Sequence, residues 1–188
     1  MYELIVLALL MRRPFHGYLI VKVTNDIIGP WAKISSGTLY PLLTRMEKAR
    51  LIVVVSVDES HGVAGERPSR TFSITEEGRK RFQQIMMDMS SNLGDYQRIF
   101  RFKLVFFDLL QKQERLLLFN HYINYCQTSI LYLQTEMANI TYEITEPSEH
   151  RFLTNIVRTM QHMVSQLQTE LDWATSLRDQ ELAENDMP

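Results

Sequence analysis

The sequence predicts a mainly α-helical protein in two parts, of which only the first contains β-structure. Glycine and proline recur every few residues up to residue 78, so this part should consist of short elements joined by turns. Two runs within it alternate in side-chain character, as paired strands do. Neither glycine nor proline occurs between residues 95 and 146, where long helices are expected. We therefore divide the chain into residues 1–88 and residues 89–188.

Three helices are expected at the start of the chain, over residues 2–11, 16–28 and 35–49. The first is apolar almost throughout and ends before Pro14. In the other two, apolar residues recur at spacings of three and four, which places them on one face of a helix. Ser35 or Ser36 can supply the N-cap oxygen of the third helix, and Pro41 is tolerable in its opening turn.

A β-hairpin should follow the third helix. Residues 51–58 are rich in β-branched side chains, with alternate valines on one face. The chain alternates again from Arg70, with Phe72 and Ile74 on one face, so the two runs should pair. Three helices followed by a long hairpin is the order of elements in a winged helix-turn-helix.

Three long helices should make up the second part, over residues 95–110, 113–140 and 148–186. In the last of them, apolar residues step mostly by three and four, like the seam of a coiled coil. The two shorter helices before it cannot hide such a seam entirely, so we expect part of it to face a second copy of the chain. The seam consists of Leu153, Ile156, Met160, Met163, Leu167, Leu171 and Ala174.

The composition argues against several classes of protein. With 188 residues, of which 45% are hydrophobic, the chain is long enough to bury a core. Its longest early apolar stretch, residues 4–11, is shorter than the roughly 20 residues that cross a bilayer, and it lacks the features of a secretory signal. Cys126 is the only cysteine, and no histidine and cysteine residues have metal-ligand spacing. We expect a cytoplasmic protein without a membrane segment, metal or other cofactor.

Charge is divided unevenly between the two parts. The whole chain has a formal charge of −2, but residues 1–88 carry 12 lysines and arginines against 9 acidic residues. Residues 89–188 carry 8 against 13. A polyanion such as double-stranded DNA should therefore meet the first part, although ordinary scatter of surface charge is an alternative explanation.

The start of the third helix is the main candidate for DNA contact. Hydroxyls and free backbone N–H groups there suit phosphates and base edges, and the N-terminal residues of a recognition helix enter the major groove. The alternative is that a serine caps the helix and the other side chains are merely solvated. The candidate residues are Lys33, Ser35, Ser36, Gly37, Thr38, Tyr40, Thr44 and Lys48.

Arginines flank the expected tip of the hairpin, at Arg67 and Arg70. Guanidinium groups in such a wing can enter a minor groove and would add affinity more than specificity. Alternatively, they keep an exposed loop soluble. The basic run at residues 79–81 fits a solvated helix face as well as a phosphate contact.

Aromatic side chains gather in the second part and could line a pocket for an aromatic ligand. A set of this kind is more often core. Its members are Phe100, Phe102, Phe106, Phe107, Phe119, Tyr122, Tyr125 and Tyr132. His121 and Cys126 lack a third group that would orient a base for a nucleophile, so we do not expect an enzyme.

A series of motifs runs from Leu4 to about Arg81 in a characteristic order. Its main parts are Gly17-Tyr18-Leu19-Ile20, Gly37-Thr38-Leu39-Tyr40-Pro41-Leu42-Leu43, Met46-Glu47-Lys48, Arg67-Pro68 and Ile74-Thr75-Glu76-Glu77-Gly78-Arg79. In this order the chain resembles the PadR family of bacterial transcriptional regulators. The segment around Phe102-Lys103-Leu104 and the long helices after it resemble the longer PadR subfamily, which includes regulators of virulence genes and of phenolic-acid detoxification.

The sequence departs from the PadR pattern at three positions. Arg50 stands where the family usually has glycine after the recognition helix, and a left-handed non-glycine residue costs on the order of 1 kcal/mol. Either the helix ends differently here or this strain is tolerated. Ser69 replaces a frequent basic residue and Phe72 a frequent tyrosine, which puts one contact between the wing and a phosphate in doubt.

The resemblance implies a sequence-specific DNA-binding regulator, expected to be a repressor. It would act as a homodimer on a pseudo-palindromic operator, with a small aromatic or phenolic molecule as a candidate effector. The alternative is a winged-helix adaptor that binds proteins and no operator. DNA binding that weakens with salt would separate the two, because phosphate contacts release counterions.

Overall fold

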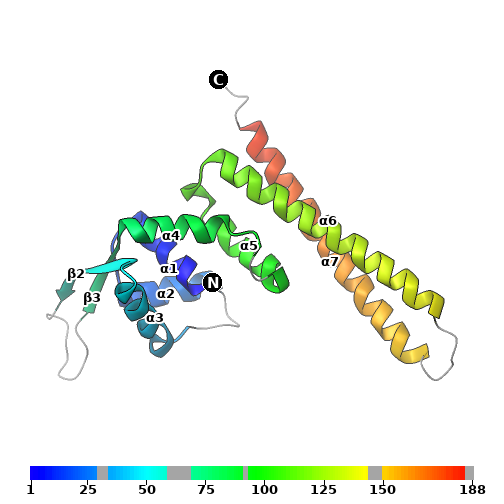
Figure 1. Cartoon of the computed structure of the whole chain (residues 1–188), viewed down its shortest axis with the longest axis horizontal. Coiled ribbons are helices and arrows are strands. Elements are labelled where there is room, and N and C mark those ends of the chain that lie inside the picture. The colour runs from blue at the N-terminus through cyan, green and yellow to red at the C-terminus, as the bar shows by residue number, and fades with distance from the viewer. Residues whose placement is uncertain (29–33, 59–68, 91–92, 144–149, 185–188) are drawn as a thin grey trace. The chain divides into compact units, whose positions relative to one another are not determined.

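The computed structural model describes residues 1–28, 34–58, 69–90, 93–143 and 150–184 (Figure 1). The described residues form two compact units, Met1–Leu110 and Gln111–Pro188. The first unit contains α1 (Tyr2–Arg12), β1 (Phe15–His16), α2 (Gly17–Ile28), α3 (Ser36–Lys48), β2 (Ile52–Asp58), β3 (Ser69–Ile74), α4 (Glu76–Met87) and α5 (Tyr96–Leu104). The second contains α6 (Lys112–Glu143) and α7 (His150–Ala183). The predicted class, mainly α with a winged helix-turn-helix first, is confirmed.

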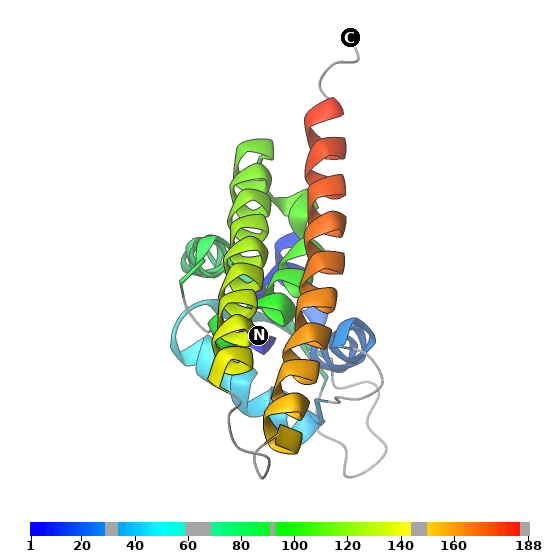
Figure 2. The same ribbon diagram turned by 90° about the vertical axis from the view of Figure 1, so that its right-hand side faces the viewer.

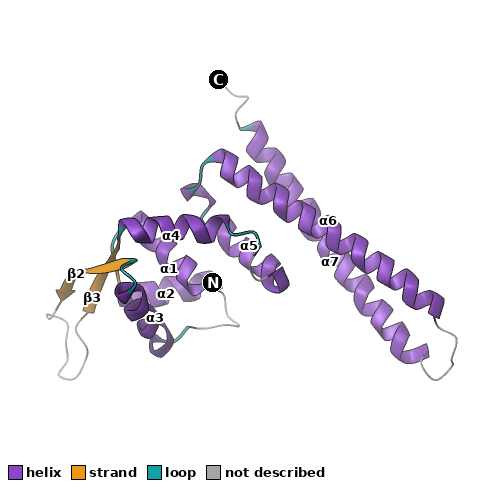
Figure 3. Cartoon of the chain, viewed as in Figure 1, coloured by secondary structure: helices purple, strands orange, loops and turns teal. Residues whose placement is uncertain are grey.

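Helix α1 is the centre of the first unit. All seven side chains from Leu4 to Leu10 are buried, and the helix packs against α2, α4 and β3. A helix that is apolar on every side is stable only when it is covered on every side. The strands lie at one end of this unit, beside α3 (Figure 3).

The sheet has three antiparallel strands in the order β1-β3-β2, so the expected hairpin is present. Phe72 and Ile74 share a buried face, as predicted. Strand β1 was not expected, because two residues are too few to show a period. Phe15 pairs with Phe72, and the side chain of His16 lies 2.9 Å from the Thr71 hydroxyl.

Strand β2 is an edge strand with one irregularity. Val54 pairs with Phe72 and Ser56 with Thr71, so the intervening Val55 is an extra residue, a β-bulge. Val53 and Val55 are exposed. Two of the alternating valines that predicted the strand therefore lie on its outer face.

Helix α3 ends in a Schellman motif around Arg50. Its φ is 59°, in the left-handed region. The Arg50 N–H donates to the Glu47 carbonyl and the Leu51 N–H to the Met46 carbonyl, both at 2.9 Å. The Thr75 hydroxyl, 2.6 Å from the Arg50 carbonyl, fixes this turn to the start of α4. The chain thus tolerates arginine in a left-handed conformation at this position.

Helix α5 belongs to the first unit. Its Tyr96 and Phe100 are buried, and the buried Lys103 ammonium donates to the Asp88 carbonyl at the end of α4. The first unit consequently extends to Leu110, whereas the division drawn from the sequence at residue 88 falls at the end of α4. An amphipathic pattern alone does not tell which core a helix covers.

Helices α6 and α7 form a long antiparallel pair, lying side by side in both views (Figures 1 and 2). At 32 residues, α6 is nearly as long as the 34-residue α7 and packs along it. Of the predicted seam, Leu167 and Ala174 are buried, Met163 is exposed, and the others are partly exposed. Part of the seam, at Leu167 and Ala174, therefore serves the contact within the chain.

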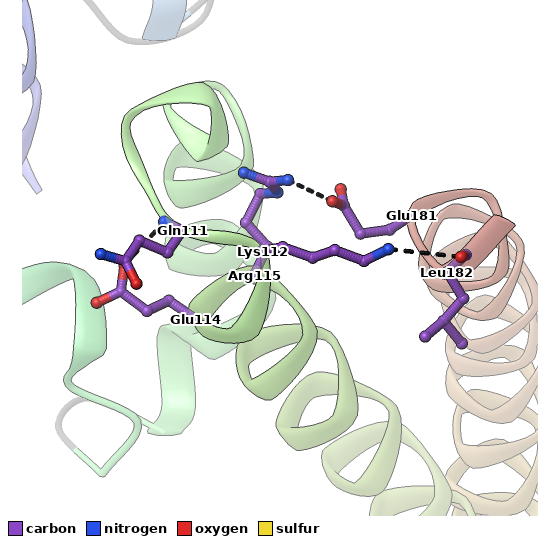
Figure 4. Close-up of polar contacts among 6 residues, drawn as sticks. All are labelled: Gln111, Lys112, Glu114, Arg115, Glu181 and Leu182. Atoms are coloured by element: carbon purple, nitrogen blue, oxygen red, sulfur yellow. Dashed lines mark hydrogen bonds and ion pairs between the residues drawn. The ribbon is translucent and has the colours of Figure 1, made fainter. Parts of the chain in front are cut away.

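Polar contacts join the start of α6 to the end of α7 (Figure 4). Arg115 forms an ion pair with Glu181, and the Lys112 ammonium lies 3.4 Å from the Leu182 carbonyl. Gln111, just before α6, makes a capping-box bond, its N–H donating to the Glu114 carboxylate at 2.9 Å. These contacts fix the register of the helix pair at this end.

The predicted aromatic set divides between the two units. Phe100 and Phe107 meet edge to face in the first, with ring centroids 6.0 Å apart, and Tyr122 and Tyr125 stack in the second. Most members of the set are buried, whereas Tyr132 is exposed.

The described helices include none with the length and hydropathy needed to cross a bilayer.

Candidate nucleic-acid interface

Helix α3 presents a polar face to solvent. Leu39, Leu43 and Met46 are buried and fix the helix on the core. The exposed residues around the start of α3 and along it are Ser35, Ser36, Gly37, Thr38, Pro41, Thr44, Arg45 and Lys48. Six of the residues predicted to contact DNA are thus exposed, five on this helix and Ser35 at its N-cap.

The side chain of the N-cap residue does not cap the first turn of α3. Ser35 is the N-cap residue, and its carbonyl accepts hydrogen bonds from the N–H groups of Thr38 and Leu39 at 3.0 Å. Its hydroxyl instead lies 3.2 Å from the Thr38 hydroxyl, so the prediction that a serine oxygen caps this helix is wrong. Among the described residues no side chain bonds to the first-turn N–H groups, and the positive end of the helix dipole there suits a phosphate.

Asn25 of α2 holds the backbone of Ile34, two residues before α3. Its amide donates to the Ile34 carbonyl at 3.1 Å and accepts from the Ile34 N–H at 2.7 Å. Ile34 itself is buried. Sequence reasoning missed this residue, because nothing in the sequence indicates which backbone an amide will meet. Lys33, another predicted contact residue, lies outside the described residues.

Tyr40 lies against the first turn of α2. A Cβ atom placed on Gly17 would lie 2.9 Å from the Tyr40 hydroxyl oxygen, so glycine leaves room for this ring. Tyr40 is partly buried as a result. It therefore joins α2 to α3.

Two exposed residues of α2 add to the candidate interface. Tyr18, next to Gly17, is 70% exposed, and Lys22 lies one turn later on the same helix face. A large aromatic side chain so exposed is unusual in a packed domain. Together with Arg45 of α3, these are contact candidates that sequence reasoning did not single out.

Arg70 of β3 is bound to α3. Its Nη2 atom lies 2.9 and 3.0 Å from the two carboxylate oxygens of Glu47, and its guanidinium lies 5.4 Å from the centroid of the Phe72 ring. The Arg70 guanidinium, which was predicted to enter a minor groove, is thus held by contacts within the domain. Arg67 lies outside the described residues.

The basic run at the start of α4 is partly neutralised. Arg81 forms an ion pair with Glu3 at 2.8 Å, and this bond raises the pKa of Arg81. Arg79 lies 3.5 Å from the Met11 sulfur, and Lys80 is exposed. Arg81 therefore ties α4 to α1, which favours a structural use of this residue.

The interface described above falls within a known domain. Residues 6–84 match the sequence profile of the Transcriptional regulator PadR-like family. These residues form a PadR-like domain. It runs from α1 to α4 and includes the exposed face of α3 and both strands of the hairpin.

Solved structures similar to this chain include Bacillus subtilis PadR in complex with operator DNA. It is 16% identical with a TM-score of 0.39, over 95% of this chain and 98% of that chain. Bacillus subtilis PadR in complex with p-coumaric acid is 18% identical with a TM-score of 0.37, over 92% and 98%. The Vibrio cholerae virulence activator AphA is 19% identical with a TM-score of 0.35, over 98% and 97%. No curated protein matches the chain. The family profile carries the assignment.

Proposed function

We propose that the protein is a sequence-specific DNA-binding transcriptional regulator whose α3 enters the major groove. One observation carries this proposal: in a PadR-like domain, α3 exposes hydroxyl and basic side chains behind an N-terminus that the Ser35 side chain does not cap. Backbone N–H groups and hydroxyls at such a start suit phosphates, and Thr44, Arg45 and Lys48 suit groove edges and phosphates further along.

The proposal includes a homodimer that acts as a repressor on a pseudo-palindromic operator. Large apolar side chains exposed on α6 and α7 support pairing, since monomers rarely leave many of them in water. They are Leu117, Leu131, Tyr132, Phe152, Met163, Trp173 and Leu182. A two-fold axis would place two copies of α3 about one helical turn of DNA, or a multiple, apart.

A small aromatic or phenolic effector belongs to the same proposal. Most of the aromatic side chains named as its candidate lining are buried and contribute to the cores of the two units. We therefore propose that an effector would have to enter by displacing packed side chains. Titration of the DNA complex with p-coumaric acid, using benzoic acid as a control, would test this part by release of the duplex.

The central experiment is selection of duplexes from a random-sequence pool by the full-length protein, followed by binding titrations at several salt concentrations. We expect enriched duplexes with two related half-sites, and affinity that falls steeply with salt. Lys48→Ala should weaken binding by about 1 kcal/mol, with Lys80→Ala of α4 as the matched control. Tyr40→Phe should test the hydroxyl while keeping the ring on Gly17. Enrichment of no duplex, with binding to a protein partner instead, would favour the adaptor.

A further inference from the structure

We propose that Glu47 is a positioning residue that holds the wing on α3 through Arg70. This inference rests on the proposed function. It assigns Arg70 to the internal geometry of the domain and not to a DNA phosphate. The orientation of the exposed face of α3 relative to the hairpin would then depend on this ion pair.

The contact joins two elements that are distant in the sequence. Glu47 lies in the last turn of α3 and Arg70 in β3, 23 residues later. One guanidinium nitrogen lies within 3.0 Å of both carboxylate oxygens, and the two side chains are only 37% and 33% exposed. A charge-assisted pair that is two-thirds covered is ordered better than a pair of solvated side chains.

The other side of the guanidinium is also held. It lies 5.4 Å from the centroid of Phe72, whose ring is fully buried. Phe72 occupies the middle of the central strand and pairs with Phe15 and Val54. Arg70 is thereby anchored on the sheet and reaches α3 from a fixed point.

Glu47 is placed where a small shift would move the DNA-facing side chains. It lies between the buried Met46 and the exposed Lys48, and its carbonyl accepts the Arg50 N–H of the Schellman motif. Only the short turn after Lys48 connects α3 to β2 through the backbone. The pair with Arg70 adds a second link, from α3 to the strand beyond β2.

The direction in which DNA affinity changes when Glu47 is neutralised separates a positioning role from simple charge repulsion. A carboxylate beside a DNA-binding face repels phosphates, so its neutralisation alone should raise affinity for any duplex. If Glu47 positions the wing, Glu47→Gln should instead lower affinity for the selected duplex. The same substitution at Glu77, an exposed residue of α4 with no ion pair among the described residues, provides the matched control.

The experiment uses full-length protein, a duplex selected by it from a random pool, and an unselected duplex. We expect Glu47→Gln and Arg70→Gln each to weaken binding of the selected duplex by about five- to ten-fold, and the double variant to be no worse than either. The salt slope should stay that of the wild type, because no phosphate contact is lost. Arg70→Lys, which keeps the charge, should also weaken binding.

Tighter binding of both duplexes by Glu47→Gln, together with a salt slope reduced by about one in Arg70→Gln, would overturn the inference. Arg70 would then be a phosphate contact that Glu47 merely competes for. If the wild type selects no duplex, the proposed function fails, and the link between Glu47 and Arg70 is then tested by unfolding measurements alone. A double-mutant cycle on urea unfolding should show coupling between the two residues, and additive effects would show that no such link exists.

Discussion

The first unit and the α6–α7 pair differ in how they protect their apolar residues. Helix α1 buries seven consecutive side chains beneath neighbouring elements of its own unit. Among the described side chains of α7, only Leu167 and Ala174 are buried, although this helix is about three times as long. A helix surrounded on all sides is stabilised within its unit, whereas a two-helix pair has one contact face and leaves the rest outside. The comparison predicts that substitutions of apolar residues act on folding in the first unit, whereas in the second unit those outside the contact face act on association.

The sharpest test of this difference lies within α7 itself. Leu167→Asp places a carboxylate in the contact with α6. We expect this substitution to lower the free energy of unfolding by more than about 3 kcal/mol and to unfold the helix pair. Met163→Asp, one turn away and 43% exposed, should leave the helices intact but weaken pairing between copies. Circular dichroism reports the first effect and sedimentation the second. A folded, fully dimeric Met163→Asp protein would locate the pairing surface elsewhere.

In the first unit, the largest effect is expected at Gly78. A Cβ atom there would lie 2.0 Å from the Leu51 carbonyl oxygen, so α4 or the turn after α3 would have to move. We expect Gly78→Ala to destabilise the unit by about 3 kcal/mol in urea unfolding. Gly94→Ala is the control, because its added Cβ would meet nothing within 4 Å. Equal effects of the two substitutions would contradict this account.

Sequence patterns predicted most of the fold because the spacing of apolar residues indicates which face of a helix or strand is buried. Helix α1, the stripe of α3 and the buried face of β3 were all visible in this way. Strand β1 was not, because it has two residues. The pairs between Asn25 and Ile34 and between Glu47 and Arg70 were also missed, since each depends on two segments meeting in space. The exposed polar face of α3 could be predicted, but the internal engagement of Arg70 could not.

A third test concerns the buried Lys103 of α5. Burial lowers its pKa to about 8, and nearby Asp88 partly opposes this shift. An unfolded lysine keeps its proton up to its ordinary pKa of 10.5, so the unfolded state binds more protons between pH 8 and 10.5. The free energy of unfolding should therefore rise by on the order of 2 kcal/mol, through the deprotonation of this lysine, as pH rises through that window. Lys103→Met should remove the gain, measured as the difference in urea unfolding between pH 7.5 and 10. An unchanged pH profile would contradict the assignment.

The smallest expected effect is a gain. Arg50→Gly relieves a left-handed backbone conformation, and we expect stabilisation by about 0.5–1 kcal/mol after the greater flexibility of unfolded glycine is counted. The same substitution at the exposed Arg45, within α3, should destabilise by about 1 kcal/mol. Opposite signs in thermal unfolding would confirm the Schellman geometry. Destabilisation at both positions would mean that the Arg50 side chain contributes contacts of its own.

The β-bulge at Val55 has a consequence for solubility. Among the described residues no strand pairs with the outer edge of β2, and the N–H and C=O groups of such an edge are where another chain could add a strand and start aggregation. An extra residue bends the strand and breaks the regular spacing of those groups. A foreign strand that began to pair with β2 at Val53 would therefore fall out of register at Val55. The bulge thus protects the protein from extending its sheet from one molecule to the next.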